Sequence, residues 1–336
     1  MTDQHDSPGD PGTDRNELAQ RVEQALLGGE RRYTRIEVTK VAGVELDRVR
    51  KLWMAMGFAE VGDEDVVFTD GDVEAVRLLD TLVGLGAIDS ADEVSVARTL
   101  GQTLSRLADW QANQLLSRVR ELGAGTEDVA PLAGSLLPVM EGLQSYVWRR
   151  HLAAAAGRAL SAPDEELTAH TLVVGFADIV GYTSTTRHAD IESLAALLEA
   201  FEYDAAETIA AHRGRVVKTV GDEVLFVADS AADAAGIAVA LTNPDRDERG
   251  LPTLRVGLAR GQVLLRFGDV YGSVVNLAAR LTALARPGTA LVDREMADAL
   301  ASEPDFTLRS LRPASVRGYQ HLRSWALRPS AEYPSE

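Results

Sequence analysis

The stretch VVKTVGDEVLF, residues 216–226, decides the fold of the C-terminal half of this chain. Two apolar runs flank Gly221-Asp222, and a short turn between two such runs predicts a β-hairpin. Asp222 and Glu223 would then stand at the hairpin tip, where acidic residues are common for turn chemistry alone. Lys218 lies inside the first apolar run. A lysine in such a strand either reaches toward solvent or points into a pocket, and the stretch by itself favours solvent.

A second acidic position lies in FADIVGYT, residues 176–183. An apolar strand ends at Asp178 and a turn leads into a helix, so the carboxylate would lie at a sheet edge beside a helix N-terminus that favours anions. Mg²⁺ prefers hard oxygen ligands of this kind, with phosphate oxygens completing its shell. An aspartate is also a common helix cap, and this motif alone leaves both interpretations open. A second carboxylate nearby, such as Asp222, would create a site for two divalent cations.

The third segment is FGDVYGSVVNLAARL, residues 267–281. It predicts a helix on which Asn276 and Arg280, four residues apart, share one face. If that face lines a cleft, the pair could hold a ribose oxygen and a phosphate together. Taken alone, the two residues would be interpreted as part of a solvated helix face.

The pattern around these segments predicts an α+β domain with a mainly antiparallel sheet, because short β-rich runs alternate with helices. The predicted strands span 171–177, 214–219, 223–228, 253–258, 262–267 and 290–293, and the predicted helices span 191–212, 230–241, 273–285 and 294–300.

The N-terminal half is predicted to be all-α over residues 17–155. A polar, acidic tail at residues 1–16 is expected to be disordered, and a linker is expected at 156–167, where an alanine run gives way to Pro163 and acidic residues. Residues 33–82 resemble a small winged helix-turn-helix. DNA binding is disfavoured because residues 60–75 contain seven acidic side chains and no basic one, which would repel phosphate. We therefore favour a helical regulatory unit.

Composition excludes several classes of function. There are no cysteines, so disulfides, thiolate nucleophiles and Cys-based zinc sites are excluded. The sequence contains no run of 18 apolar residues that could span a membrane, and its N-terminus lacks a signal-peptide pattern. A cytoplasmic protein without a membrane partner is therefore expected. The net charge of −17 makes nucleic acid an unlikely partner. A pocket that holds two divalent cations can still bind a triphosphate.

Together, and in this order, the three segments resemble the catalytic domain of class III adenylyl and guanylyl cyclases over residues 168–328. The resemblance implies a ferredoxin-like catalytic domain behind the all-α domain, and an adenylate cyclase that closes ATP into 3′,5′-cyclic AMP and releases pyrophosphate. Diguanylate cyclases share this kind of fold, but their Gly-Gly-Asp-Glu-Phe-type tip is absent, since position 220 is Val.

The resemblance also assigns roles to individual residues. It implies that each active site holds two ions, Mg²⁺ or Mn²⁺, on the carboxylates of Asp178 and Asp222 and on the carbonyl of Ile179. Lys218 and Asp269 occupy the base-recognition positions, and Asn276 and Arg280 the transition-state positions. Arg317, in Val316-Arg317-Gly318, occupies a position that often supplies a basic triphosphate contact; the family often has Lys there.

ATP is the expected substrate because guanylyl cyclases of this family typically carry Glu and Cys, or a similar pair, at the base-recognition positions. In the family the metal aspartates and the other residues of one site come from two different catalytic domains. A single domain that carries both sets implies a homodimer with two composite sites. The alternative is an inactive nucleotide-binding sensor or scaffold of the same fold. The resemblance to soluble actinobacterial cyclases further implies an inhibitory, pH-responsive N-terminal domain, or else a plain dimerisation arm, with His151 and His170 flanking the linker.

Overall fold

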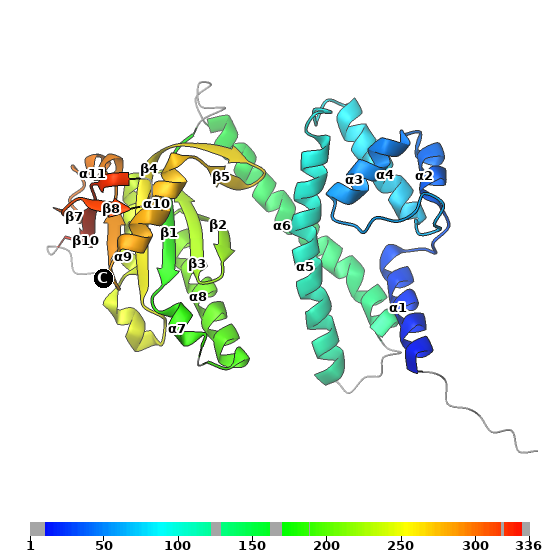
Figure 1. The fold of residues 1–336 in the computed structure, drawn as a ribbon, viewed down its shortest axis with the longest axis horizontal. Helices are drawn as coiled ribbons and strands as arrows, with labels where there is room; N and C mark the ends of the chain where they lie inside the picture. Colours follow the sequence, from blue (N-terminus) through cyan, green and yellow to red (C-terminus); the bar gives the residue numbers. More distant parts are fainter. Residues whose placement is uncertain (1–10, 122–128, 162–169, 188, 317–318, 331–336) are drawn as a thin grey trace, which may run out of the picture. The chain divides into compact units, whose positions relative to one another are not determined.

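The computed structural model describes residues 11–121, 129–161, 170–187, 189–316 and 319–330. It divides into two compact units whose boundary lies between Arg158 and Ala159 (Figure 1). Each unit is described separately below.

The N-terminal unit is helical. Its small core joins apolar side chains of α2, α3 and α4, and the backbone bridge between Tyr33 and Phe68 fastens the loop before α2 to the loop before α4. Thr34 forms a capping box with Glu37 at the start of α2, which satisfies backbone N–H groups that the helix leaves free. The helices are α1 (Pro11–Leu27), α2 (Arg35–Ala42), α3 (Leu46–Ala55), α4 (Asp70–Gly84), α5 (Glu93–Glu121) and α6 (Val129–Ser161).

Both ends of this unit correct the sequence-based boundaries. The tail expected at residues 1–16 was assigned too long, because α1 begins at Pro11 and proline is well tolerated in the first turn of a helix. Residues 1–10 lie outside the described residues. The linker expected at 156–167 begins too early, because α6 continues to Ser161. The alanine run at 153–156 has the highest helix propensity and prolongs the helix rather than ending it.

The C-terminal unit is the predicted α+β domain. Its first four strands and two of its helices follow one another as β-α-β-β-α-β, which is the ferredoxin-like order. The sheet runs β2-β3-β1-β4-β6-β10-β7 and is antiparallel except for the β4–β6 pair. The strands are β1 (His170–Ile179), β2 (Arg215–Val220), β3 (Glu223–Ala228), β4 (Leu254–Arg266), β5 (Asp269–Tyr271), β6 (Ala290–Val292), β7 (Phe306–Ser310), β8 (Ala314–Val316), β9 (Tyr319–Leu322) and β10 (Trp325–Pro329).

The two strands predicted at 253–258 and 262–267 form one strand, β4. It pairs with β1 over ten consecutive positions, from Ile179↔Leu254 to His170↔Val263, and this ladder holds the chain extended through Gly261. In the sequence, Gly261 predicts a break between two strands. In the structure it instead makes room for α10. A Cβ at Gly261 would lie 2.7 Å from Val274 Cγ2.

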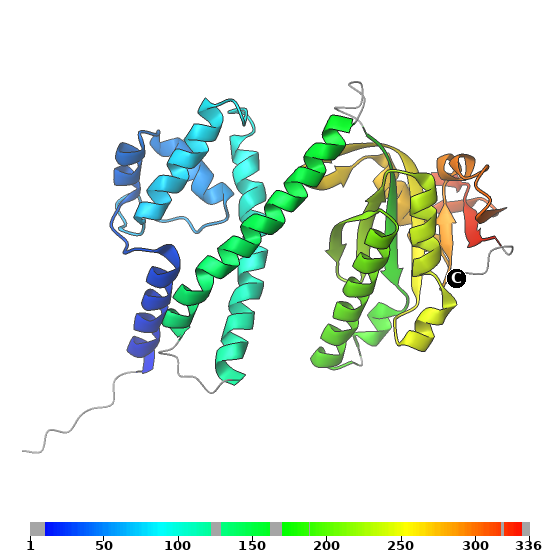
Figure 2. The same ribbon diagram turned by 180° about the vertical axis from the view of Figure 1, so that it is seen from behind.

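Helices cover both faces of the sheet. On one face α8 (Ile191–Ala211) and α9 (Ala231–Leu241) pack over the larger apolar core. On the other face α10 (Ser273–Leu284) covers a second core made with β1, β3 and β4. Figure 1 shows α10 in front of the sheet, and Figure 2 shows α8 and α9 in front from the opposite side. The remaining helical segments are α7 (Tyr182–Thr185), α11 (Arg294–Ala299) and a 3₁₀ turn at Pro244–Arg249.

The position of α10 is fixed by a close approach to β4 at Gly257. A Cβ at this position would lie 2.2 Å from the amide nitrogen of Thr282 and 2.5 Å from the carbonyl oxygen of Ala278. Thr282 is buried, and its hydroxyl donates to the carbonyl of Phe176 on β1 at 3.3 Å. Interiors pack too densely to absorb such an overlap. This contact therefore fixes the distance between α10 and the sheet.

Within the described part of the chain, no helix combines the length and apolar character that a membrane crossing requires.

Candidate active site

Asp178 and Asp222 meet where β1 ends and the β2–β3 hairpin turns. Val220 pairs with Glu223, so Gly221 and Asp222 form the two-residue turn, and Gly221 has the positive φ of 63° that such turns require at this position. The amide of Ile179 donates to the carbonyl of Asp222 at 3.0 Å and fastens the turn to the end of β1. The predicted hairpin and the predicted meeting of two carboxylates are therefore both found.

The chemistry of these carboxylates is set by burial and by their own charges. Burial raises the pKa of Asp178; the ion pair with Arg255 opposes this increase, and the charge of Asp222 adds to it. The pKa of Glu223, the residue after Asp222, is raised more strongly. Burial, followed by the charges of Asp178 and Asp222, raises the pKa of Glu223 to about 7. Burial and neighbouring negative charge thus both disfavour the charged forms of Asp178 and Glu223.

Arg255 supplies the positive charge at this point. Its Nε donates to Asp178 Oδ2 at 2.6 Å, and its Nη2 contacts the same oxygen. Arg255 on β4 is the register partner of Asp178 on β1, which brings the two side chains to one face of the sheet.

Lys218 and Asp269 form the second group. The Lys218 ammonium donates to Asp269 Oδ2 at 2.5 Å, which joins β2 to β5 across 51 residues of sequence. Asp269 reaches this position because β4 and β5 form a hairpin in which Arg266 pairs with Asp269. Neither side chain is fully buried, so both remain accessible to a ligand.

Asn276 and Arg280 lie on α10 with the predicted spacing of four residues. Asn276 is exposed and Arg280 half-buried, while Ala278 and Leu281 between and beside them pack into the second core. Among the described residues, the Arg280 guanidinium has no ion-pair or hydrogen-bond partner. A half-buried guanidinium without a partner is available to an anion.

The remaining predicted positions have different outcomes. Ile179 is buried, with its side chain in the larger core. Arg317 lies outside the described residues, just after β8.

The donor set at Asp178 and Asp222 fits a divalent cation. Two hard oxygen donors are held together at the cost of mutual repulsion, and a cation between them would remove that cost. No group of three or more His, Asp or Glu side chains with metal-binding geometry occurs among the described residues. Mg²⁺ takes six oxygen ligands, so two protein carboxylates would leave places in its coordination shell for other oxygens, such as those of phosphates.

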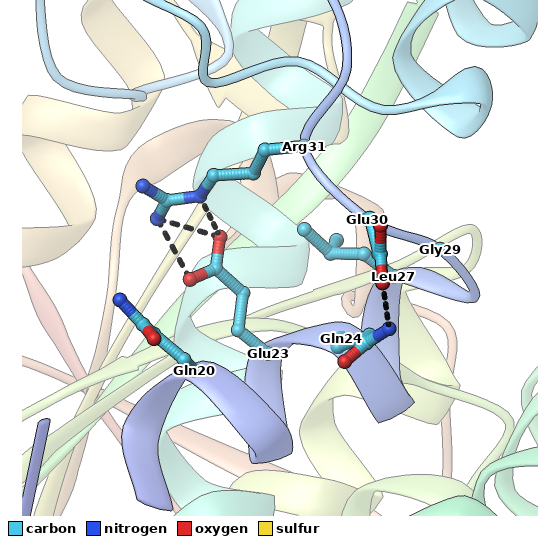
Figure 3. Close-up of a pocket in the computed structure, with 7 residues that line it drawn as sticks. All are labelled: Gln20, Glu23, Gln24, Leu27, Gly29, Glu30 and Arg31. Carbon is cyan, nitrogen blue, oxygen red and sulfur yellow. Dashed lines mark hydrogen bonds and ion pairs between the residues drawn. The ribbon is translucent and has the colours of Figure 1, made fainter. Parts of the chain in front are cut away.

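A surface pocket of about 260 Å³ lies elsewhere, between α1 and the loop that follows it. Figure 3 shows that its polar side chains already pair with one another: Arg31 donates to Glu23, and Gln24 donates to Glu30. None of the predicted site residues lines it.

Sequence reasoning missed Arg255 and did not give Glu223 a role. Arg255 is a lone charge in the apolar run 254–259, and that was its only signal. Its role depends on strand register, which local patterns do not determine. Glu223 had the more visible signal of adjacency to Asp222.

Comparison with known families matches both units. Residues 166–329 match the family described as adenylate and guanylate cyclase catalytic domain. Residues 14–147 match the family described as adenylate cyclase regulatory domain.

Three relatives are similar over most of their length. An adenylate cyclase of Streptomyces coelicolor is 45% identical over 301 residues, which cover 88% of this chain and 78% of the relative. An adenylate cyclase of Glutamicibacter nicotianae is 36% identical over 330 residues, covering 91% and 81%. A pH-sensitive adenylate cyclase of Mycobacterium tuberculosis (strain CDC 1551 / Oshkosh) is 30% identical over 310 residues, covering 87% and 77%.

The raised pKa of Glu223 predicts a pH-dependent stability in the absence of divalent cations. Between its usual value of 4.5 and about 7, the native state binds more protons than the unfolded state, so stability should fall as pH rises through this window. We expect Glu223→Gln to remove on the order of 1–3 kcal/mol of this fall. Calorimetry of the catalytic unit's transition in EDTA, between about pH 5 and about pH 7.5, measures it.

Part of the pH dependence should survive in this variant, because burial also raises the pKa of Asp293 to about 6 and acts in the same direction. Glu199→Gln, which neutralises an exposed carboxylate on α8, serves as the control and should keep the wild-type slope. Equal slopes in the Glu223→Gln variant and the wild type would refute the assignment of this shift to Glu223.

Proposed function

The chain belongs to the adenylate and guanylate cyclase family, and from that premise we propose that it converts ATP into 3′,5′-cyclic AMP and pyrophosphate. Relatives named adenylate cyclase at 36–45% identity, similar over most of their length, support this activity. The observation that carries the choice of substrate is the contact between Lys218 and Asp269.

A lysine and an aspartate side by side offer one donor and one acceptor, which match the edge of adenine. Lys218 donates to the ring nitrogen N1, and Asp269 accepts from the 6-amino group. Guanine presents an oxygen and an N–H at these positions, so the same pair would leave its groups mismatched, and unpaired buried polar groups are costly.

The reaction needs no covalent nucleophile from the protein. Asp178 and Asp222 would hold the cations, with the carbonyl of Ile179 as a further ligand. When bound, two Mg²⁺ or Mn²⁺ ions would activate the ribose 3′-hydroxyl and neutralise charge on the phosphates. Arg280 donates to the α-phosphate oxygens as their charge grows, since its guanidinium presents a fixed fork of donors. Asn276 orients the ribose. Arg317 is a candidate for a contact with the triphosphate.

We further propose that the active enzyme is a homodimer with two composite sites. Each site takes the metal carboxylates from one chain and Lys218, Asp269, Asn276 and Arg280 from the other. The accessible Lys218–Asp269 pair and the unpartnered Arg280 guanidinium support this arrangement, because these groups are open to a second chain and its ligand.

Subunit mixing tests the composite sites. We expect the rate to fall by a factor of at least about 10²–10³ in the Asp222→Ala variant and in the Arg280→Ala variant. Each substitution removes a group that acts on the reacting phosphate or its cation. Mixed together, they should recover up to about a quarter of the wild-type rate, because half of the dimers are mixed and each has one intact site. Cyclic AMP production is the measurement.

The matched control mixes Asp222→Ala with Asp178→Ala, where both sites of every mixed dimer lack a metal ligand. Recovery in the first mixture and none in the second is expected. If subunit exchange is demonstrated and neither mixture recovers, the sites are not composite.

The proposed recognition of adenine by Lys218 and Asp269 is tested separately. Replacing Lys218 by Glu together with Asp269 by Cys should lower the ratio of kcat/KM for ATP to that for GTP by at least about tenfold, because the donor and acceptor no longer match adenine. Gln262→Ala, at an exposed position on β4, is the control and should keep the wild-type ratio. An unchanged ratio in the double variant would remove the two residues from base recognition.

We also propose that the N-terminal unit inhibits the catalytic unit at neutral pH. The match of residues 14–147 to a cyclase regulatory domain and the similarity to a pH-sensitive relative support this proposal. His151 is exposed on α6 and His170 begins β1, so both are placed near the junction of the units in the sequence.

Deleting residues 1–158, up to the observed boundary, should raise activity at neutral pH and flatten its pH dependence, because the inhibitory unit is gone. His151→Gln with His170→Gln in the full chain should weaken the pH response while keeping basal activity. The pH profile of cyclic AMP production, compared with that of the intact chain, is the measurement. Identical profiles and rates would leave the N-terminal unit as a dimerisation arm only.

A further inference from the structure

Three adjacent strands place Glu223, Asp178 and Arg255 in one row across the sheet. Glu223 on β3 is the register partner of Asp178 on β1, and Asp178 is the register partner of Arg255 on β4. Directly opposed residues of antiparallel strands project to the same face. The face is the one covered by α10, since the next residues with this orientation, Leu225 and Ala259, lie in the second core.

Within this row, Arg255 directs two donors at a single oxygen atom. Its Nε lies 2.6 Å from Asp178 Oδ2, and its Nη2 contacts the same oxygen. The Asp178 side chain is only 12% exposed, whereas that of Arg255 is 35% exposed. The Arg255 side chain is therefore more open to solvent than the carboxylate that it contacts.

The contact between Arg255 and Asp178 differs from an ordinary surface ion pair because further acidic groups lie beside it. Arg255 is the basic group that acts on both Asp178 and Glu223, and these two carboxyls also feel the charge of Asp222. Loss of Arg255 would remove the positive charge that offsets the three acidic groups. A divalent cation at the same place would supply the same compensation. The guanidinium and the cation therefore compete for one oxygen.

We propose that Arg255 is an internal counter-ion that competes with the divalent cation for Asp178, so that the enzyme binds the cation weakly until it arrives together with the nucleotide. This inference rests on the proposed function, which identifies Asp178 as a cation ligand. The phosphates of a nucleotide bring further negative charge and further ligands with the cation. That addition favours exchange of the guanidinium for the cation, so cation and nucleotide bind cooperatively.

A different role for Arg255 would have the opposite signature. If the guanidinium merely held Asp178 in the orientation that the cation needs, its loss would misplace the carboxylate and weaken cation binding. If Arg255 competes, its loss frees Oδ2 and strengthens binding. The direction of change in cation affinity thus separates competition from support.

The test measures Mn²⁺ binding to the full-length protein without nucleotide, by the loss of the free-ion signal in electron paramagnetic resonance. Arg255→Gln should bind Mn²⁺ about tenfold more tightly than wild type, because a charge-assisted hydrogen bond of this kind is removed from the competition. Arg255→Lys keeps the charge but not the fork of donors, and its affinity should lie between the two. An unchanged or weaker affinity in Arg255→Gln overturns the proposal.

Arg260→Gln is the matched control. It removes the same charge from the same strand, but five residues further along, roughly 16 Å away at the usual rise of a strand. Its Mn²⁺ affinity should remain within about twofold of wild type, because a charge at that distance is screened. A gain in this variant equal to that of Arg255→Gln would reduce the effect to net charge and overturn the specific contact.

The same titrations with a non-hydrolysable ATP analogue complete the test. Wild type should bind Mn²⁺ more tightly when the analogue is present, and the advantage of Arg255→Gln should shrink. Thermal stabilisation by Mn²⁺ alone should likewise be larger in the variant than in wild type. If wild type makes cyclic AMP but Arg255→Gln gains no affinity, the inference fails and the function stands. If Asp178→Ala binds Mn²⁺ as wild type does, the assignment of Asp178 fails and takes the inference with it.

Discussion

Repulsion between like charges at the end of β1 is the constraint on which the rest of the catalytic unit depends. The backbone holds Asp178, Asp222 and Glu223 together regardless of their charge: strand register fixes Glu223 opposite Asp178, and the Ile179 amide fixes the turn that carries Asp222. Burial and these charges raise the pKa of Asp178 and of Glu223, and Arg255 pairs with Asp178. Folding already brings the carboxylates together against their mutual repulsion. A cation can therefore bind without further free energy being spent on assembling its ligands.

Close packing fixes the helix that carries the remaining residues of the proposed site. Gly257 lets α10 approach β4 until the backbones nearly touch, and Gly261 makes room for Val274 near the start of the helix. These two contacts fix the height and direction of α10, and with them the positions of Asn276 and Arg280. Reacting groups must be held to within a fraction of an ångström to be useful. The glycines of β4 thus position the two residues of the proposed site that α10 carries.

The sequence predicted those site residues whose neighbours along the chain form a recognisable motif. Asp178 ends an apolar strand, Asp222 sits in a two-residue turn, and Asn276 and Arg280 share a helix face; each pattern is local, and each predicted element is present. Arg255 was missed because its meaning depends on a register between strands 77 residues apart, which no local pattern reveals. The same limit split β4 at Gly261, where pairing with β1 overrides the local signal.

Element ends were harder to predict than element types for a related reason. Polar residues and Pro163 follow the alanine run in α6 and predict a linker there, yet the helix propensity of alanine continues the helix to Ser161.

The contrast between the partnered and the unpartnered charges bears on how the site is completed. Asp178 has its counter-ion within the chain, and so does Lys218, but the Arg280 guanidinium has none among the described residues although it is half-buried on a rigid helix. Folded chains seldom leave a partly desolvated charge in that condition unless a ligand or another chain compensates it. Of Lys218, Arg255 and Arg280, only the last lacks a counter-ion among the described residues. It is there that negative charge would grow on the α-phosphate in the proposed reaction.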